Sequence, residues 1–185
     1  MGYDFTISRN RDTKRDKNGV LRRSWYASVN LYVPHEKWVG KLREYKAFKV
    51  VKDETGKERW KPLHRGALVN RKEIDIINKY NSEIRGIYNF YRLADNVSVL
   101  NKFSFIMEGS LKKTFAAKYQ STVKKVSEER TKNGIFGVSY FNKAGKQRCE
   151  FCHGGFTKKD IPLLENVDLL QIISVMPILI ALRQD

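Results

Sequence analysis

The feature that most constrains the fold is a stretch of apolar residues at helical spacing across positions 73–118. In its first half, the side chains of one broad stripe recur every three or four positions, namely Ile74, Ile77, Asn81, Ile84, Ile87, Tyr88, Tyr91 and Ala94. This period places them on one face of an α-helix, so the stripe is predicted to be buried. Gly86 lies inside this regular helix at a cost of about 1 kcal/mol relative to alanine, which indicates a close contact with another helix.

Two more amphipathic helices are predicted after cap signals at Asp95, Asn96 and Ser98. The apolar face of the next helix comprises Val99, Leu100, Phe103, Ile106 and Met107. We expect Gly109 and Ser110 to end or kink that helix. The third helical stretch, residues 110–130, is expected to bury the apolar side chains that recur along it, namely Leu111, Phe115, Tyr119, Val123 and Val126. Short successive amphipathic helices of this kind predict a helical bundle.

The residues before the helices favour small β elements. Positions 5–7 and 25–33 have strand propensity, and the charged segment 9–23 between them is predicted to be a loop or a hairpin tip. A short helix is expected after Pro34, with apolar and aromatic side chains on one face, namely Trp38, Leu42 and Tyr45. The polar segment 52–61 is expected to be a turn or linker.

After the helices the period changes. Beyond a turn at Asn133-Gly134, the segments IFGVSYF and QRCEFC flank a bend at Gly145, which is the pattern of a β-hairpin. The chain is therefore predicted to be mainly α with small β elements. Its expected parts are a basic N-terminal region at 1–62, a helical core at 63–132, the hairpin at 133–158 and an apolar C-terminal tail at 159–185.

The charge of the chain restricts its partners. A net charge of +16 and a pI near 9.9 indicate a polyanionic partner, because cations that neutralise phosphates release condensed counterions. Nucleic acid is the expected partner, while a solvated cationic face and an anionic membrane surface are the alternatives. The longest uncharged run, 169–182, is shorter than the roughly 20 residues of a spanning helix, so no membrane span is predicted.

Cysteine usage favours a reducing compartment. Two cysteines cannot staple a chain of 185 residues, and no secretory leader pattern is present at the start of the sequence. We therefore expect the bacterial cytoplasm or an organelle matrix.

Basic residues on or beside the predicted helices are the candidates for phosphate contacts. They are Arg85, Arg92, Lys102, Lys112, Lys113, Lys118, Lys124 and Lys125. The alternative for the two arginines is an ion pair with a carboxylate such as Glu108 or Asp95, and the alternative for the lysines is helix solubility. No catalytic residue and no small-molecule substrate are predicted.

Cys149, Cys152 and His153 suggest a zinc site, but the sequence offers too few ligands to complete it. A structural site needs four ligands, and no cysteine or histidine follows His153. His35 and His64 are isolated from any cysteine or acidic companion. We predict no metal site and no cofactor.

Four segments resemble the maturase region, domain X, of group II intron-encoded proteins. They are GYDFTI at 2–7, LHRGALVN at 63–70, KYNSEIRGIYNFYRLADN at 79–96 and LNKFSFIMEGSLKKTFAAKY at 100–119. The resemblance implies that the chain begins at the end of a reverse transcriptase palm and continues as a thumb-like helical bundle. It also implies binding of group II intron RNA to promote splicing, and a DNA target for an intact protein.

The resemblance also identifies what the sequence lacks. Polymerases of this family carry a Tyr-x-Asp-Asp metal motif, whereas no two aspartates are adjacent in this chain, so we expect no polymerase activity from it alone. Two other functions stay open: a general module for duplex DNA or RNA, and a fragment of a metal-dependent nuclease.

Overall fold

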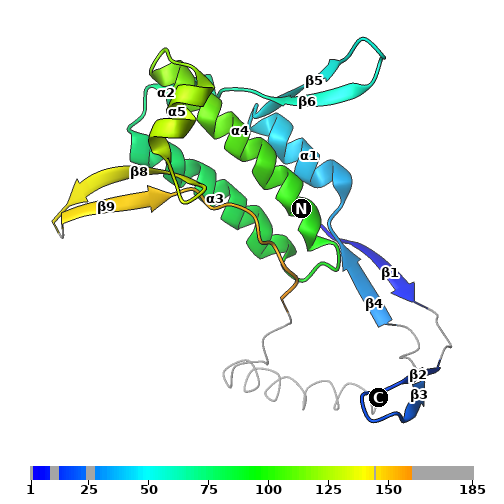
Figure 1. Cartoon of the computed structure of the whole chain (residues 1–185). Helices are drawn as coiled ribbons and strands as arrows, with labels where there is room; N and C mark the ends of the chain where they lie inside the picture. The colour runs from blue at the N-terminus through cyan, green and yellow to red at the C-terminus, as the bar shows by residue number, and fades with distance from the viewer. Residues whose placement is uncertain (1, 9–12, 24–27, 144, 160–185) are drawn as a thin grey trace, which may run out of the picture.

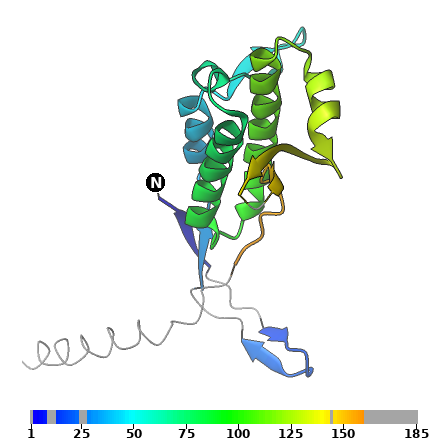
Figure 2. The ribbon, with the colours of Figure 1, turned by 90° about the vertical axis from the view of Figure 1, so that its left-hand side faces the viewer.

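A computed structural model of the chain describes residues 2–8, 13–23, 28–143 and 145–159. Three helices form its body: α1 (His35–Glu44), α3 (Glu73–Tyr91) and α4 (Leu100–Lys118). They lie side by side, and α4 contacts both of the others (Figure 1 and Figure 2). Two short helices, α2 (Gly66–Val69) and α5 (Val123–Arg130), pack against α4, and a single 3-10 turn, Val97–Val99, precedes it.

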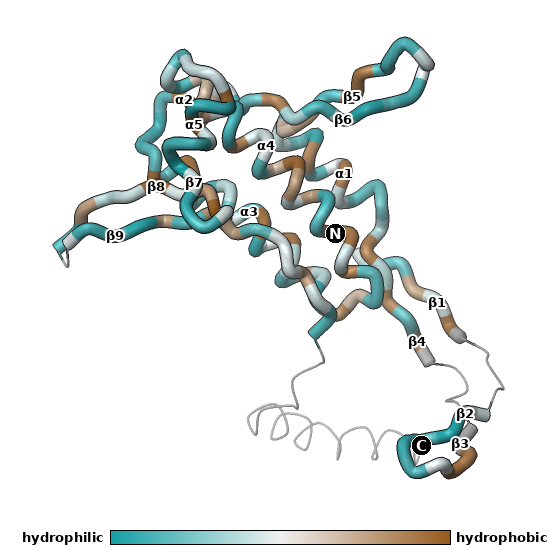
Figure 3. The backbone as a smooth tube through the Cα atoms, viewed as in Figure 1, coloured by the Kyte–Doolittle hydropathy of each residue, from teal (hydrophilic) through white to brown (hydrophobic). Residues whose placement is uncertain are grey.

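The strands are short, and within the described ranges they pair as antiparallel hairpins or ribbons. They are β1 (Asp4–Ser8) with β4 (Ser28–Tyr32), β2 (Thr13–Arg15) with β3 (Leu21–Arg23), β5 (Phe48–Lys52) with β6 (Glu58–Pro62), and β7 (Thr131–Lys132) with β8 (Ile135–Asn142) and β9 (Gly145–Glu150). The β5–β6 and β8–β9 hairpins project from the helical body (Figure 1). Both carry hydrophilic stretches, chiefly along β6 and β9 (Figure 3). The predicted fold class, mainly α with small β elements ending in a β-hairpin, is confirmed.

The predicted stripe of α3 is largely buried. Six of its eight residues lie in the core, while Ile74 and Tyr88 are half-buried. The helix also buries Ile76 and Tyr80, because it is covered on one side by α4 and on another by β8 and β9. The polar Asn81 can be buried in this stripe because its side-chain amide bonds to the backbone at the end of the last hairpin. Its Nδ2 donates to the Glu150 carbonyl at 2.8 Å, and its Oδ1 accepts from the Cys152 amide at 2.8 Å.

The predicted helix break at Gly109 and Ser110 is wrong. Helix α4 runs through both residues and ends at Lys118, after which Gln120 adopts the left-handed conformation with φ 48°. The reason for the glycine is space, because a Cβ there would lie 2.7 Å from Cγ of Pro62 at the end of β6. Ser110 is buried and donates its hydroxyl to the Leu63 carbonyl at 2.6 Å.

Three smaller expectations also need correction. No atom of another segment lies within 4 Å of a Cβ built on Gly86, so it marks no close helix contact. Tyr119 and Val123 are 44% and 37% exposed, because the third helical stretch is interrupted before α5 begins. Segment 52–61, predicted as a turn or linker, contains the turn of the β5–β6 hairpin at residues 53–57, and its other five residues belong to the two strands. The expected strand residues 25–27 and the tail from 160 onward lie outside the described residues.

Candidate nucleic-acid interface

Three of the four α4 lysines that were predicted to contact phosphate have partners inside the protein. Lys112 Nζ lies 2.7 Å from Oε1 of Glu108, one turn earlier. Lys113 Nζ donates to the Pro62 carbonyl at 2.8 Å. Lys118 Nζ donates to the carbonyls of Val69 at 3.0 Å and Arg71 at 2.9 Å. The ammonium groups of Lys113 and Lys118 therefore join α4 to the end of β6 and to the C-terminal end of α2, whereas that of Lys112 pairs within α4.

The lysines of α5 are placed differently. Lys124 and Lys125 are exposed in the first turn of an eight-residue helix, and neither forms an ion pair among the described residues. The hydroxyl of Thr122 caps this helix by accepting from the Lys125 amide at 3.3 Å. No acidic residue occupies the first turn. Free N–H groups and the helix dipole already make a helix N-terminus positive, so two lysines there raise the potential further and favour an anion.

Arg85 is exposed on α3 and Arg92 is half-buried directly after it. The alternative that they pair with Glu108 or Asp95 does not hold, because those carboxylates pair with Lys112 and Lys158. Neither arginine makes an ion pair within the described ranges. Arg85 lies near Cys149, where burial raises the pKa of the thiol and the arginine opposes that rise. Lys102 is exposed on α4.

The structure also shows basic residues that the sequence reasoning missed. The β5–β6 hairpin exposes cations along both strands and its turn, namely Lys49, Lys52, Lys57, Arg59 and Lys61. Among these, only Arg59 forms an ion pair within the described part of the chain, with Asp53 at 3.0 Å. The alternation of Lys57, Arg59 and Lys61 after Gly56 was the available signal, but the segment was interpreted as a turn or linker.

Other cations have structural roles. The Arg65 guanidinium forms a two-pronged ion pair with Glu83, at 2.6 and 3.0 Å, and lies 5.0 Å from the Tyr80 ring centre. The Tyr80 hydroxyl in turn contacts Ser110 Oγ at 2.8 Å and Thr114 Oγ1 at 3.0 Å. Burial raises the pKa of Tyr80. This polar cluster lies between α3 and α4 and is enclosed by the chain that leads from β6 to α2.

The cysteines do not form a recognisable metal centre. Both are free thiols, and Cys149 contacts Asn78 Oδ1 at 3.3 Å. In the described ranges, no group of three histidine, cysteine or acidic side chains could hold a metal ion. Over the same ranges, no helix is both long enough and apolar enough to cross a lipid bilayer.

Comparison with known proteins places this arrangement in a family. The family model for type II intron maturases matches residues 26–157, which is most of the chain. The chain therefore belongs to the type II intron maturase family and represents the maturase segment, domain X, of such proteins.

Two relatives show how much of a larger protein is covered. The group II intron-encoded protein LtrA of Lactococcus lactis subsp. cremoris is 36% identical over 154 residues, which are 83% of this chain and 25% of that protein. Maturase K of Taxus baccata is 28% identical over 113 residues, 60% of this chain and 21% of that protein. The chain thus spans about a quarter of the length of the curated relatives it matches.

Proposed function

We propose that this chain binds group II intron RNA and stabilises its folded, splicing-competent form. The observation that carries the proposal is membership of the maturase family across residues 26–157. The net charge of +16 supplies the physical means, because intron RNA is a dense polyanion and each neutralised phosphate releases counterions. A protein that binds the folded RNA more tightly than its unfolded forms shifts the population toward the folded RNA.

The eight predicted cations differ in how they would serve this function. Arg85, Lys102, Lys124 and Lys125 are exposed and could reach a phosphate without breaking an internal contact. Lys112, Lys113 and Lys118 would have to share their ammonium groups with their present partners, and Arg92 is half-buried. The first turn of α5 is therefore the strongest phosphate candidate, since its lysines are supported by the helix terminus.

In a longer protein, the same segment would form the thumb of a reverse transcriptase and could meet a DNA target there. The chain alone has no adjacent aspartates, so we propose that it does not polymerise by itself. Both cysteines are free, which fits work in the reducing bacterial cytoplasm or an organelle matrix.

A competition experiment tests the proposal. Labelled group II intron RNA is bound to the chain at fixed salt and challenged with unlabelled intron RNA or duplex DNA. The proposal expects intron RNA to compete better and the RNA to remain intact with or without divalent metal. Equal competition by duplex DNA would point to a general nucleic-acid module, and metal-dependent cleavage would point to a nuclease.

A further inference from the structure

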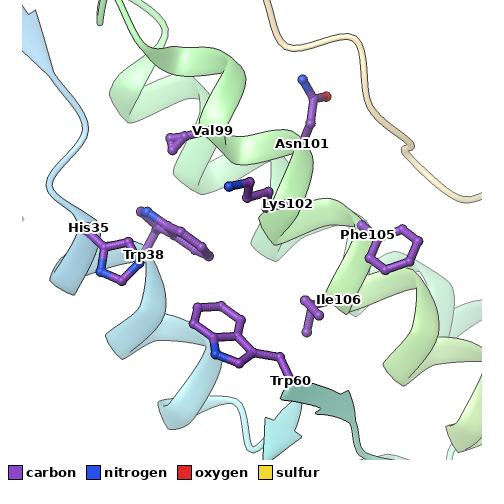
Figure 4. Close-up of a pocket in the computed structure, with 8 residues that line it drawn as sticks. All are labelled: His35, Trp38, Trp60, Val99, Asn101, Lys102, Phe105 and Ile106. Carbon is purple, nitrogen blue, oxygen red and sulfur yellow. The ribbon is translucent and has the colours of Figure 1, made fainter. Parts of the chain in front are cut away.

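A cavity of about 700 Å³ opens between α1, β6 and the start of α4. This volume lies within the range of roughly 300–1,000 Å³ that is usual for small-molecule sites. Figure 4 shows the side chains around it, which are His35, Trp38, Trp60, Val99, Asn101, Lys102, Phe105 and Ile106. None of the phosphate candidates except Lys102 belongs to this cavity, so it is separate from the α5 terminus.

The walls of the cavity are mainly aromatic. The rings of Trp38 and Trp60 lie 5.6 Å apart at an angle of 50°, and His35 meets Trp38 edge-on at 5.1 Å. Phe105 is 71% exposed on α4, although a phenyl ring of this size is usually covered in a folded protein. Flat aromatic surfaces at an open cavity can stack against another flat ring.

The polar groups indicate which flat ligand would be complementary. Trp38 is only 2% exposed and its indole nitrogen is enclosed by protein atoms, so the rings that a ligand can reach are those of His35, Trp60 and Phe105. Lys102 and Asn101 are exposed at the same cavity, and no carboxylate is among its lining residues. A matching ligand would therefore combine a flat ring with a negative charge.

We propose that this cavity binds an unpaired nucleotide of RNA, with its base among the aromatic side chains and its phosphate at Lys102. Aromatic side chains are common platforms for single-stranded bases, and the phosphate of the same nucleotide would bring the negative charge to Lys102. An apolar peptide helix fits less well, because it would cover the exposed Lys102 and remove water from its ammonium group without supplying a negative charge. The inference rests on the proposed RNA-binding function.

The test uses the 185-residue chain and two RNA hairpins that differ in one position. One hairpin carries a single unpaired adenosine, and the other carries an abasic nucleotide there. We compare the wild-type chain with Phe105→Ala and with Phe141→Ala, a control at a ring that is 79% exposed on β8. Phe105→Ala is expected to weaken binding of the adenosine hairpin by about ten- to a hundredfold, and Phe141→Ala by less than about twofold.

Two features of the result distinguish this inference from the proposed function. Phe105→Ala removes no charge, so the dependence of affinity on salt should not change. The abasic hairpin should bind wild-type and Phe105→Ala chains equally. The cavity proposal would be overturned if the wild-type chain bound RNA with strong salt dependence but did not distinguish the two hairpins. A protein segment would then be the expected occupant of the cavity. Failure to bind RNA at all would overturn both.

Fluorescence provides a second measurement that does not depend on the Phe105 variant. In a Trp25→Phe chain, the remaining tryptophans are Trp38 and Trp60, both at the cavity. Stacking of a base is expected to quench their emission on addition of the adenosine hairpin and to leave it unchanged with the abasic one. Equal emission changes with both hairpins would contradict the proposal.

Discussion

Helices α4 and α5 are consecutive and both rich in lysine, yet they use that residue in different ways. The ammonium groups of Lys113 and Lys118 donate to backbone carbonyls 47–51 positions earlier in the chain and so hold the body together. Lys124 and Lys125 are exposed at a helix terminus that is already positive. A lysine-rich sequence therefore contains both cations with internal partners and exposed cations, and only the fold distinguishes them.

The largest loss of stability is expected at the buried ion pair between Arg65 and Glu83. Glu83→Ala would leave the Arg65 guanidinium buried and unpaired, since the two side chains are only 6% and 11% exposed. Removing one partner of such a pair typically costs about 3–5 kcal/mol of the free energy of unfolding. Urea denaturation measures this loss. The control is Glu44→Ala, which breaks the exposed Lys41–Glu44 pair and should cost about 0.3–0.5 kcal/mol.

The next effect tests the close approach of β6 to α4. Gly109→Ala places a Cβ 2.7 Å from the Pro62 ring and should cost about 1–3 kcal/mol through overpacking. Gly86→Ala has open space around it and should stabilise the chain by up to about 1 kcal/mol, because alanine favours the helix. Thermal unfolding of both variants checks the opposite signs. A stabilising Gly109→Ala would show that the two segments are not in contact.

A smaller effect on stability is expected when one lysine of α4 and one of α5 are replaced and compared. Lys118→Met keeps most of the stem but removes two hydrogen bonds to carbonyls, so it should cost about 1–2 kcal/mol. Lys124→Met breaks no ion pair and should change the free energy of unfolding by less than about 0.5 kcal/mol. The midpoints of urea denaturation distinguish these values, provided that the dependence of the free energy of unfolding on urea concentration is unchanged. Equal destabilisation by the two substitutions would mean that α4 and α5 use their lysines in the same way.

Much of the fold follows from local pattern in the sequence. The period of α3 predicted its buried face, and alternation around a glycine bend predicted the β8–β9 hairpin. The predicted helix break at Gly109 was wrong because a glycine that ends a helix and a glycine that allows another segment to pack closely look alike in sequence. The difference lies in Pro62, which reaches α4 only through the tertiary fold.

The candidate interface was less predictable than the fold. What a lysine ammonium meets depends on carbonyls that are distant in the chain, as for Lys113 and Pro62. The cavity beside Trp38 also could not be foreseen, because its walls come from three segments that do not adjoin in sequence. The face of the first helix that was predicted from its apolar and aromatic residues does pack inward, since Trp38 and Leu42 are buried and Tyr45 is half-buried.

The most direct test of the central claim measures how intron RNA affinity depends on salt in two double variants. Lys124→Gln/Lys125→Gln should lower the slope of log affinity against log salt by about one for each phosphate that the protein no longer neutralises. The matched control, Lys52→Gln/Lys57→Gln, removes the same charge from the exposed β5–β6 hairpin and should change the slope less. Equal slopes in the two double variants, or a slope unchanged from wild type in the α5 variant, would contradict the account.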